Sequence, residues 1–348
     1  MTAAVRRERA RTGDGAAPPP RPPGSLRRNL GLLLVAAGAF LLTLAPLLRF
    51  HVHPQMAALP GDLDAVWQLE DESGSYLDTT TWETRDDVDI ARRTELTGRV
   101  TPGNPDWVTW EMSVDTASSA GMIDHVDRRV IVDRSTAMAV NCCGEHVDGD
   151  RAVRQAGLVL RWPAGAEAEE YPFYDADVRA APPMRLEAVD EVGGLAARRY
   201  VQTVEPAQVP DSAHEVPAEV MGLDRSGTVR VTRWVELVRT YWVEPVSGDL
   251  LDAAEQRRET LRTGDGGAER VALEADLSMP DHRIGANVDN AERRAGLLTL
   301  TRSTLPAAFA AFGVLLALTG LARTGTWARR GHAEEDGEGP AGSGSERD

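Results

Sequence analysis

The chain has 348 residues, of which 42% are hydrophobic, and a formal net charge of −16. All 38 basic residues are arginine, and residues 50–304 hold 46 acidic residues against 26 arginines. An acidic surface of this kind repels nucleic acid, which excludes a DNA- or RNA-binding role. The two cysteines are adjacent and cannot build a disulfide framework, so the middle of the chain must fold on its own apolar core.

The N-terminal part of the chain predicts a tail followed by a membrane-spanning helix. Residues 1–28 carry seven arginines and a Gly- and Pro-rich run, which is typical of a disordered tail. The 19 residues from Leu30 to Leu48 are uncharged and would span about 28 Å as a helix, close to the thickness of a bilayer core. We therefore expect a transmembrane helix over 29–49. A cleaved signal peptide is the alternative, although this apolar run is longer than most and no small-residue cleavage site follows promptly.

Residues 50–286 predict a β-rich (α+β) domain built on antiparallel sheet. Apolar and polar residues alternate in several runs rich in β-branched and aromatic residues. These runs are 107–114, 129–133, 158–162, 197–204 and 228–244. Two segments, 130–140 and 241–251, read as a strand, an acidic turn and a second strand. This pattern indicates a meandering sheet with one face covered.

A second helical region follows the β-rich domain. Val288, Ala291 and Leu298 fall at helical spacing and predict a helix over 287–304 that leads toward the membrane. The uncharged run from Leu305 to Ala322 predicts a second transmembrane helix over 305–323, with a buried core helix as the alternative. Residues 331–348 hold no large apolar side chain, and we expect a second disordered tail over 324–348.

The arginines beside the first span predict the orientation of the chain. Arg21, Arg27 and Arg28 precede the span, whereas Arg49 alone follows closely. Cytoplasmic flanks carry the excess of basic residues, so we expect a cell-membrane protein with both termini in the cytoplasm and the central domain outside the cell.

The predicted partners follow from this topology. The lipid bilayer is the first, and small residues in both spans would allow helices to approach closely, within one chain or between chains, or are ordinary filler. These residues are Gly31, Ala36, Gly38, Ala307, Ala311, Gly313 and Ala317. Self-association through the spans and contact with envelope lipid or protein are therefore further expectations.

The sequence contains no recognised catalytic or cofactor-binding motif, so we expect no enzymatic activity and no cofactor. His51 and His53, and His146 beside the cysteines, supply too few ligands for a metal site. The candidate site is the adjacent pair Cys142 and Cys143, as a vicinal disulfide or as two free or intermolecular thiols. Adjacent Cα atoms lie about 3.8 Å apart, below the usual disulfide range, so such a bond would be strained.

Several short segments together resemble a known family. They are a first span that ends near Pro46, the segment Pro54–Asp64, the VDR-x-T pattern at Val132–Thr136, the YWV-x-P-x-SG segment at 241–248, and a helix that leads into a second span. Over residues 28–325 this layout resembles the actinobacterial PorA-type porin family. The resemblance implies channel formation in the cell envelope.

The charges within the predicted strands argue against a lipid-facing barrel, because the run 228–244 contains Arg230, Arg233, Glu236 and Arg239. If the protein conducts ions, we expect oligomerised helices to line the pore, and an acidic mouth to favour cations. The alternative is a membrane-anchored lipid- or ligand-binding β-sheet module, motivated by the aromatic residues Trp234, Tyr241 and Trp242. A purely structural or adhesive ectodomain is a third hypothesis.

Overall fold

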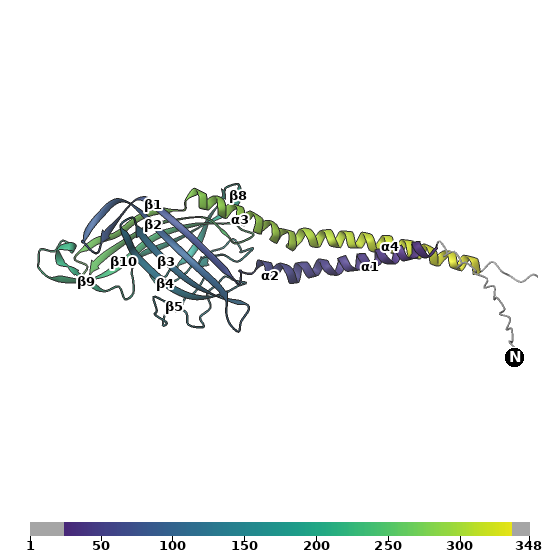
Figure 1. The fold of residues 1–348 in the computed structure, drawn as a ribbon, viewed down its shortest axis with the longest axis horizontal. Helices are drawn as coiled ribbons and strands as arrows, with labels where there is room; N and C mark the ends of the chain where they lie inside the picture. The colour runs from purple at the N-terminus through teal and green to yellow at the C-terminus, as the bar shows by residue number, and fades with distance from the viewer. Residues whose placement is uncertain (1–23, 336–348) are drawn as a thin grey trace, which may run out of the picture. The chain divides into compact units, whose positions relative to one another are not determined.

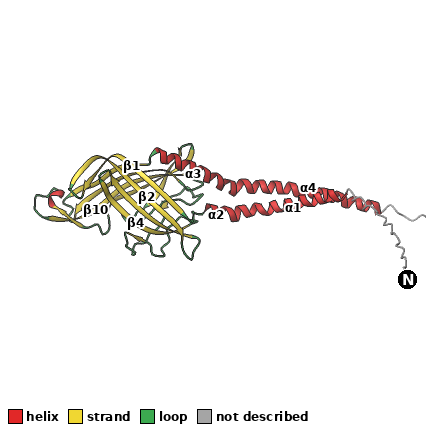
Figure 2. Cartoon of the chain, viewed as in Figure 1, coloured by secondary structure: helices red, strands yellow, loops and turns green. Residues whose placement is uncertain are grey.

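The computed structural model describes residues 24–335, and the side chains of residues 29–324 (Figures 1 and 2). The described residues divide into two compact units, one formed by 24–46 with 306–335 and the other by 47–305. Most of the predicted tails, 1–28 and 324–348, lies outside the described residues.

The helical elements are α1 (Gly24–Leu47), the π-helical turn η1 (Leu48–Val52), α2 (His53–Ala57), the 3-10 turn η2 (Ala218–Met221), α3 (Asp281–Thr299), the π-helical turn η3 (Leu300–Thr304) and α4 (Leu305–Glu335). The strands are β1 (Leu63–Asp78), β2 (Glu83–Val100), β3 (Trp107–Ser118), β4 (Gly121–Asp133), β5 (His146–Val147), β6 (Tyr171–Pro172), β7 (Pro183–Val192), β8 (Leu195–Gln208), β9 (His214–Pro217), β10 (Thr228–Val243), β11 (Leu250–Thr263) and β12 (Glu269–Ser278).

Two long apolar helical stretches lie near the ends of the chain, as the sequence predicts. The stretches Asn29–Ala57 and Asp281–Thr324 are long and apolar enough to cross a membrane. Helix α3 begins at Asp281, six residues before the predicted start at 287. Pro280 precedes it in an extended conformation (φ −63°, ψ 142°), and proline needs no helical hydrogen bond at this end.

The middle of the chain forms one large antiparallel sheet, which confirms the predicted β-rich class. The strand order is β5-β4-β3-β2-β1-β12-β11-β10-β8-β7-β6, with β9 paired to β10. Two meanders of neighbouring hairpins therefore meet where β1 pairs with β12, at Glu70 and Ser278 among other positions. The predicted hairpin at 241–251 is confirmed, because β10 and β11 pair on either side of the turn at 244–249.

One predicted strand is wrong. Residues 158–162 form no strand, although Leu158 makes isolated bridges to Met138 and to Phe173. The run is apolar because it lies in a buried segment between β4 and β7, where Leu158 and Trp162 are almost fully inaccessible. A short apolar run does not by itself distinguish a buried strand from another kind of buried segment.

The sheet is strongly curled around this inner segment. Arg233 of β10 and Asp124 of β4 form an ion pair of 3.0 Å, although β10 and β4 are six places apart in the sheet. Because neighbouring strands lie about 4.8 Å apart, a flat sheet would separate these two strands by nearly 30 Å. The concave face therefore covers the buried part of the segment from 134 to 182, the inner segment, including Leu158, Trp162 and Phe173.

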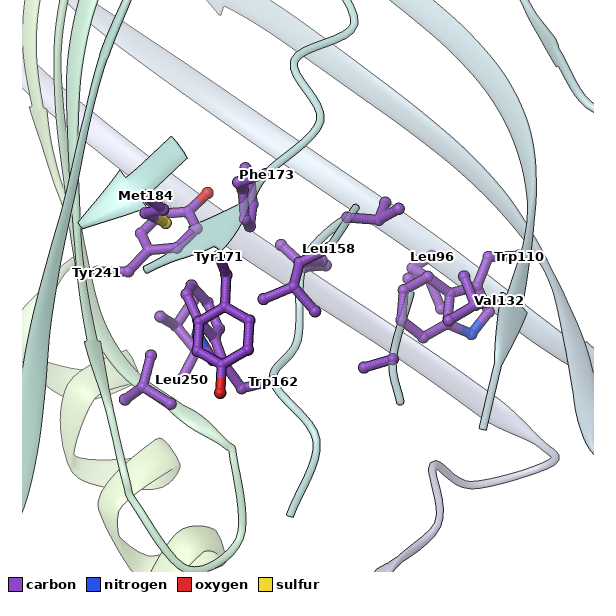
Figure 3. Packing of buried hydrophobic residues seen from close by; sticks show 14 of the residues in the cluster. Leu96, Trp110, Val132, Leu158, Trp162, Tyr171, Phe173, Met184, Tyr241 and Leu250 are labelled. Carbon is purple, nitrogen blue, oxygen red and sulfur yellow. The ribbon is translucent and has the colours of Figure 1, made fainter. Parts of the chain in front are cut away.

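Aromatic residues from the segment and the strands fill one part of the enclosed space (Figure 3). The ring of Trp162 lies 5.0 Å from that of Tyr200 and 6.0 Å from that of Tyr241. On the convex face, α3 covers a smaller apolar cluster in which Val288 and Ala291 pack with Ala197 and Leu251.

Candidate functional site

The apolar helices α1 and α4 contact one another through glycine. A Cβ atom built on Gly38 would lie 2.6 Å from the carbonyl oxygen of Gly313, and one built on Gly320 would lie 2.7 Å from the carbonyl oxygen of Gly31. Both distances are far shorter than an ordinary contact, so only glycine permits this approach of the two backbones.

The buried positions of the two helices recur every seven residues. In α1 they are Gly31, Gly38 and Ala45, and in α4 they are Pro306, Gly313 and Gly320. A period of seven residues keeps one seam of each helix against its partner. Three predicted contact residues, Ala36, Ala307 and Ala311, instead lie exposed outside this seam.

The remaining surface of the pair is apolar. The exposed large side chains include Leu33, Phe40, Phe312, Leu315 and Leu318, each more than half accessible. Apolar side chains around the outside and glycines at the contact are the arrangement expected of a helix pair whose solvent is lipid. Seen along its length, the pair has no space between its backbones at Gly38 for a water-filled path.

The interior of the curled sheet contains a second unusual feature, a network of charged side chains. The carboxylate of Asp177 lies 2.5 Å from Arg257 and 3.3 Å from Arg233. Asp175 lies 3.1 Å from Arg239, which also contacts Glu255 at 2.7 Å. Because both aspartates belong to the inner segment and the arginines to β10 and β11, the network fastens the segment to the sheet.

Arginines hold two of these carboxylates, Glu255 and Asp177, in the ionised form. Burial alone would raise the pKa of Glu255, but Arg239, Arg92 and Arg257 outweigh it and lower that pKa to about 2. Burial opposes ionisation of Asp177 as well, yet Arg257, Arg92 and Arg233 hold its pKa below the ordinary value. Acids held so firmly in the charged form are unsuited to proton transfer near neutral pH.

The space left inside the sheet is small. A cavity of about 90 Å³ lies between the inner segment and the strands, lined among others by Trp67, Met112, Arg128 and Tyr174. Sites for organic ligands usually measure about 300–1,000 Å³. Room for a lipid chain in this enclosed cavity therefore exists only if the inner segment moves, whereas a more open hollow of about 690 Å³ lies against β1, β2, β10, β11 and β12.

The aromatic residues that suggested a ligand-binding face do not share one face. Tyr241 points into the enclosed core, whereas the neighbouring Trp242 packs beside Ala197 and Leu251, under α3. Trp234 lies on the same side of β10 as Trp242, with the guanidinium of Arg262 4.7 Å from its ring centroid. Because side chains alternate between the two faces of a strand, Tyr241 lies on the inner face of β10, whereas Trp234 and Trp242 lie on its outer face.

The other candidate residues lie apart from the charge network. Cys142 and Cys143 sit in a turn with their sulfur atoms at bonding distance and their Cα atoms 3.8 Å apart, and their redox state stays a prediction. Within the described residues, no group of three or more His, Cys, Asp or Glu side chains is arranged to hold a metal ion. No sequence pattern predicts the charge network, because its members are far apart along the chain.

Comparisons with known proteins give one consistent result. A family model described as Porin PorA matches residues 30–322. A porin PorA of Corynebacterium amycolatum is 23% identical over 325 residues, which cover 72% of this chain and 82% of that protein. A porin PorA of Corynebacterium resistens is 20% identical over an alignment of 401 positions, which covers 85% of this chain and 96% of that protein.

Among solved structures, a crystal structure of a Parabacteroides distasonis protein covers 64% of this chain and 95% of its own, with 8% sequence identity. Its TM-score of 0.18 is too low to carry an argument about fold or function.

Proposed function

We propose, from the premise that the chain belongs to the porin PorA family, that it is a membrane-anchored cell-envelope protein that forms a channel by assembly of several chains. In this proposal α1 and α4 cross the membrane. Their exposed faces associate with those of other copies and line the conducting path.

The close contact between α1 and α4 carries the proposal of assembly. A single helix pair that touches backbone to backbone at Gly38 and Gly313 leaves no lumen for ions. Among the described residues, the inside of the curled sheet offers no alternative path, because the inner segment fills it and the cavity beside that segment measures only about 90 Å³. Conduction therefore requires a lumen between chains.

The charge of the sheet domain supports selectivity for cations. Residues 50–304 carry 46 acidic residues against 26 arginines. Negative charge beside the entrance of a pore raises the local concentration of cations and lowers that of anions. We expect cation-selective conductance, and we expect the selectivity for cations to fall as ionic strength rises.

The proposed topology places both termini in the cytoplasm and the sheet domain outside the cell. It is supported by the excess of arginine before the first helix. Protease added to intact cells should cleave the sheet domain and spare both termini. Protection of the sheet domain in intact cells, with cleavage after lysis, would refute this topology and indicate the opposite one.

Single-channel recording tests the proposal. Purified full-length protein is added to a planar lipid bilayer, beside a control in which both helices are kept and the sheet domain is deleted. Discrete cation-selective steps in the full chain would support a channel, and loss of selectivity in the control would assign it to the sheet domain. A silent bilayer with folded, inserted protein would refute channel formation by this chain alone.

Lipid or ligand binding by the sheet domain stays the alternative. A ligand inside the enclosed cavity would require the inner segment to leave the concave face, because that cavity measures only about 90 Å³. Lipid that co-purifies with the sheet domain in stoichiometric amount would favour this alternative.

A further inference from the structure

Two π-helical turns lie at corresponding places on the two apolar helical stretches. Turn η1 (Leu48–Val52) follows α1, and turn η3 (Leu300–Thr304) precedes α4. The backbone N–H of His53 donates to the carbonyl of Leu48, and that of Leu305 to the carbonyl of Leu300, as the wider turn requires. Such turns are rare and occur frequently at functional sites.

The two turns contact one another, and the contact is polar. The guanidinium of Arg49 donates to the carbonyl oxygen of Arg302 at 3.3 Å. Nearby, Nδ1 of His53 lies 3.3 Å from the hydroxyl of Thr301. The side chain of Arg302 passes Gly165 of the inner segment, where a Cβ atom would lie 3.5 Å from its guanidinium. Three parts of the chain therefore meet here.

The site holds positive charge without matching negative charge. Within the described residues, neither Arg49 nor Arg302 forms an ion pair with a carboxylate. Residues 47–58 and 296–305 contain no Asp or Glu at all. By contrast, Arg161 and Arg294 close by are both paired with Asp249.

We propose that the facing π-turns form a binding site for the phosphate of an anionic lipid headgroup, with Arg49 and Arg302 as the principal donors. Guanidinium groups bind phosphate through paired, charge-assisted hydrogen bonds. Arg49 directly follows the 19 uncharged residues that end at Leu48, so a spanning helix carries it to the headgroup level. The inference rests on the membrane anchoring given under Proposed function.

The test uses the full chain in nanodiscs of phosphatidylcholine, with and without phosphatidylglycerol. Native mass spectrometry counts the phosphatidylglycerol molecules retained by each chain, and titration of short-chain phosphatidylglycerol in detergent measures affinity. Each lost guanidinium should weaken binding about tenfold, so the variant R49Q/R302Q should retain no phosphatidylglycerol. The control is R258Q, which removes an exposed arginine of β11 that forms no ion pair in the described part of the chain.

Unchanged retention in R49Q/R302Q, or an equal loss in R258Q, would overturn the site. Because both arginines are exposed, the double variant should keep the wild-type thermal unfolding midpoint. Each single variant should weaken phosphatidylglycerol binding about tenfold. Titration with inorganic phosphate separates a free anion from a lipid: equal affinity for both would overturn the lipid assignment.

The result can be read separately from channel formation. Retention of phosphatidylglycerol by a chain that conducts no ions would support the site while refuting the proposed channel. Normal conductance together with no phosphatidylglycerol retained by the wild-type chain would do the opposite.

Discussion

Replacement of Gly38 by alanine should separate the two apolar helices. The added methyl carbon would lie 2.6 Å from the carbonyl oxygen of Gly313 and 2.7 Å from the backbone nitrogen of Ala317. Both are backbone atoms, which cannot turn aside as a flexible side chain can. Ordinary contacts between carbon and oxygen begin near 3.3 Å, so the helices must move apart by roughly 1 Å. Overpacking of this size costs about 1–3 kcal/mol.

The assay is equilibrium unfolding of the full chain in detergent micelles, compared with a matched glycine. Gly296 lies in α3, and a Cβ atom built there would meet nothing within 4 Å. Alanine at Gly296 should therefore stabilise the chain by up to about 1 kcal/mol, through its better helix propensity. The two substitutions are chemically identical and should have effects of opposite sign. An equal or higher stability of G38A would refute the backbone contact between α1 and α4.

Further predictions concern the sheet domain. Glu255 has a pKa of about 2 in the folded protein against an ordinary 4.5, so its ionised form stabilises the fold by on the order of 3 kcal/mol. This stabilisation is complete above about pH 4.5 and is lost as pH falls toward 2. Unfolding midpoints measured across this range should show the decline, and a flat profile would contradict it. Asp177→Asn should lower the free energy of unfolding by about 3–5 kcal/mol, because it leaves buried arginines unpaired. Asp64→Asn removes a carboxylate from an exposed ion pair and should leave denaturant unfolding unchanged. Similar effects of the two substitutions would disprove the role of burial. Gly248→Ala should cost about 1–3 kcal/mol from its backbone alone, because φ is +73° and the methyl group would also overlap the carbonyl oxygen of Trp162; wild-type stability by calorimetry would disagree with this turn.

Much of the architecture could be predicted from local patterns in the sequence. The two uncharged runs give the apolar helices, and the turn-forming residues between 244 and 249 give the hairpin of β10 and β11. Strand β2 has a weaker signal, because Arg92 interrupts the alternation of Val88, Ile90 and Leu96 on its inner face. Its outer face meets solvent, and its inner face carries Arg92 into the charge network.

The charge network could not be predicted because it depends on long-range contacts. Asp177 and Arg257 are 80 positions apart, and each alone reads as a solvated surface residue. Only the curl of the sheet brings them together and removes them from water. The same limit applies to Arg49 and Arg302, which are 253 positions apart and meet through two turns without a sequence signature.

The pairing of β1 with β12 has a consequence for how the domain folds during synthesis. Each half of the sheet is a meander of local hairpins that can form early, but β1 finds its second neighbour only in the last strand. Until the chain has been made as far as Ser278, one long edge of β1 is open to pairing with another copy. Contacts this distant along the chain form slowly and expose intermediates to aggregation. A factor that shields this edge while the chain is being made would therefore act mainly on the yield of folded protein, and little on the stability of the finished fold.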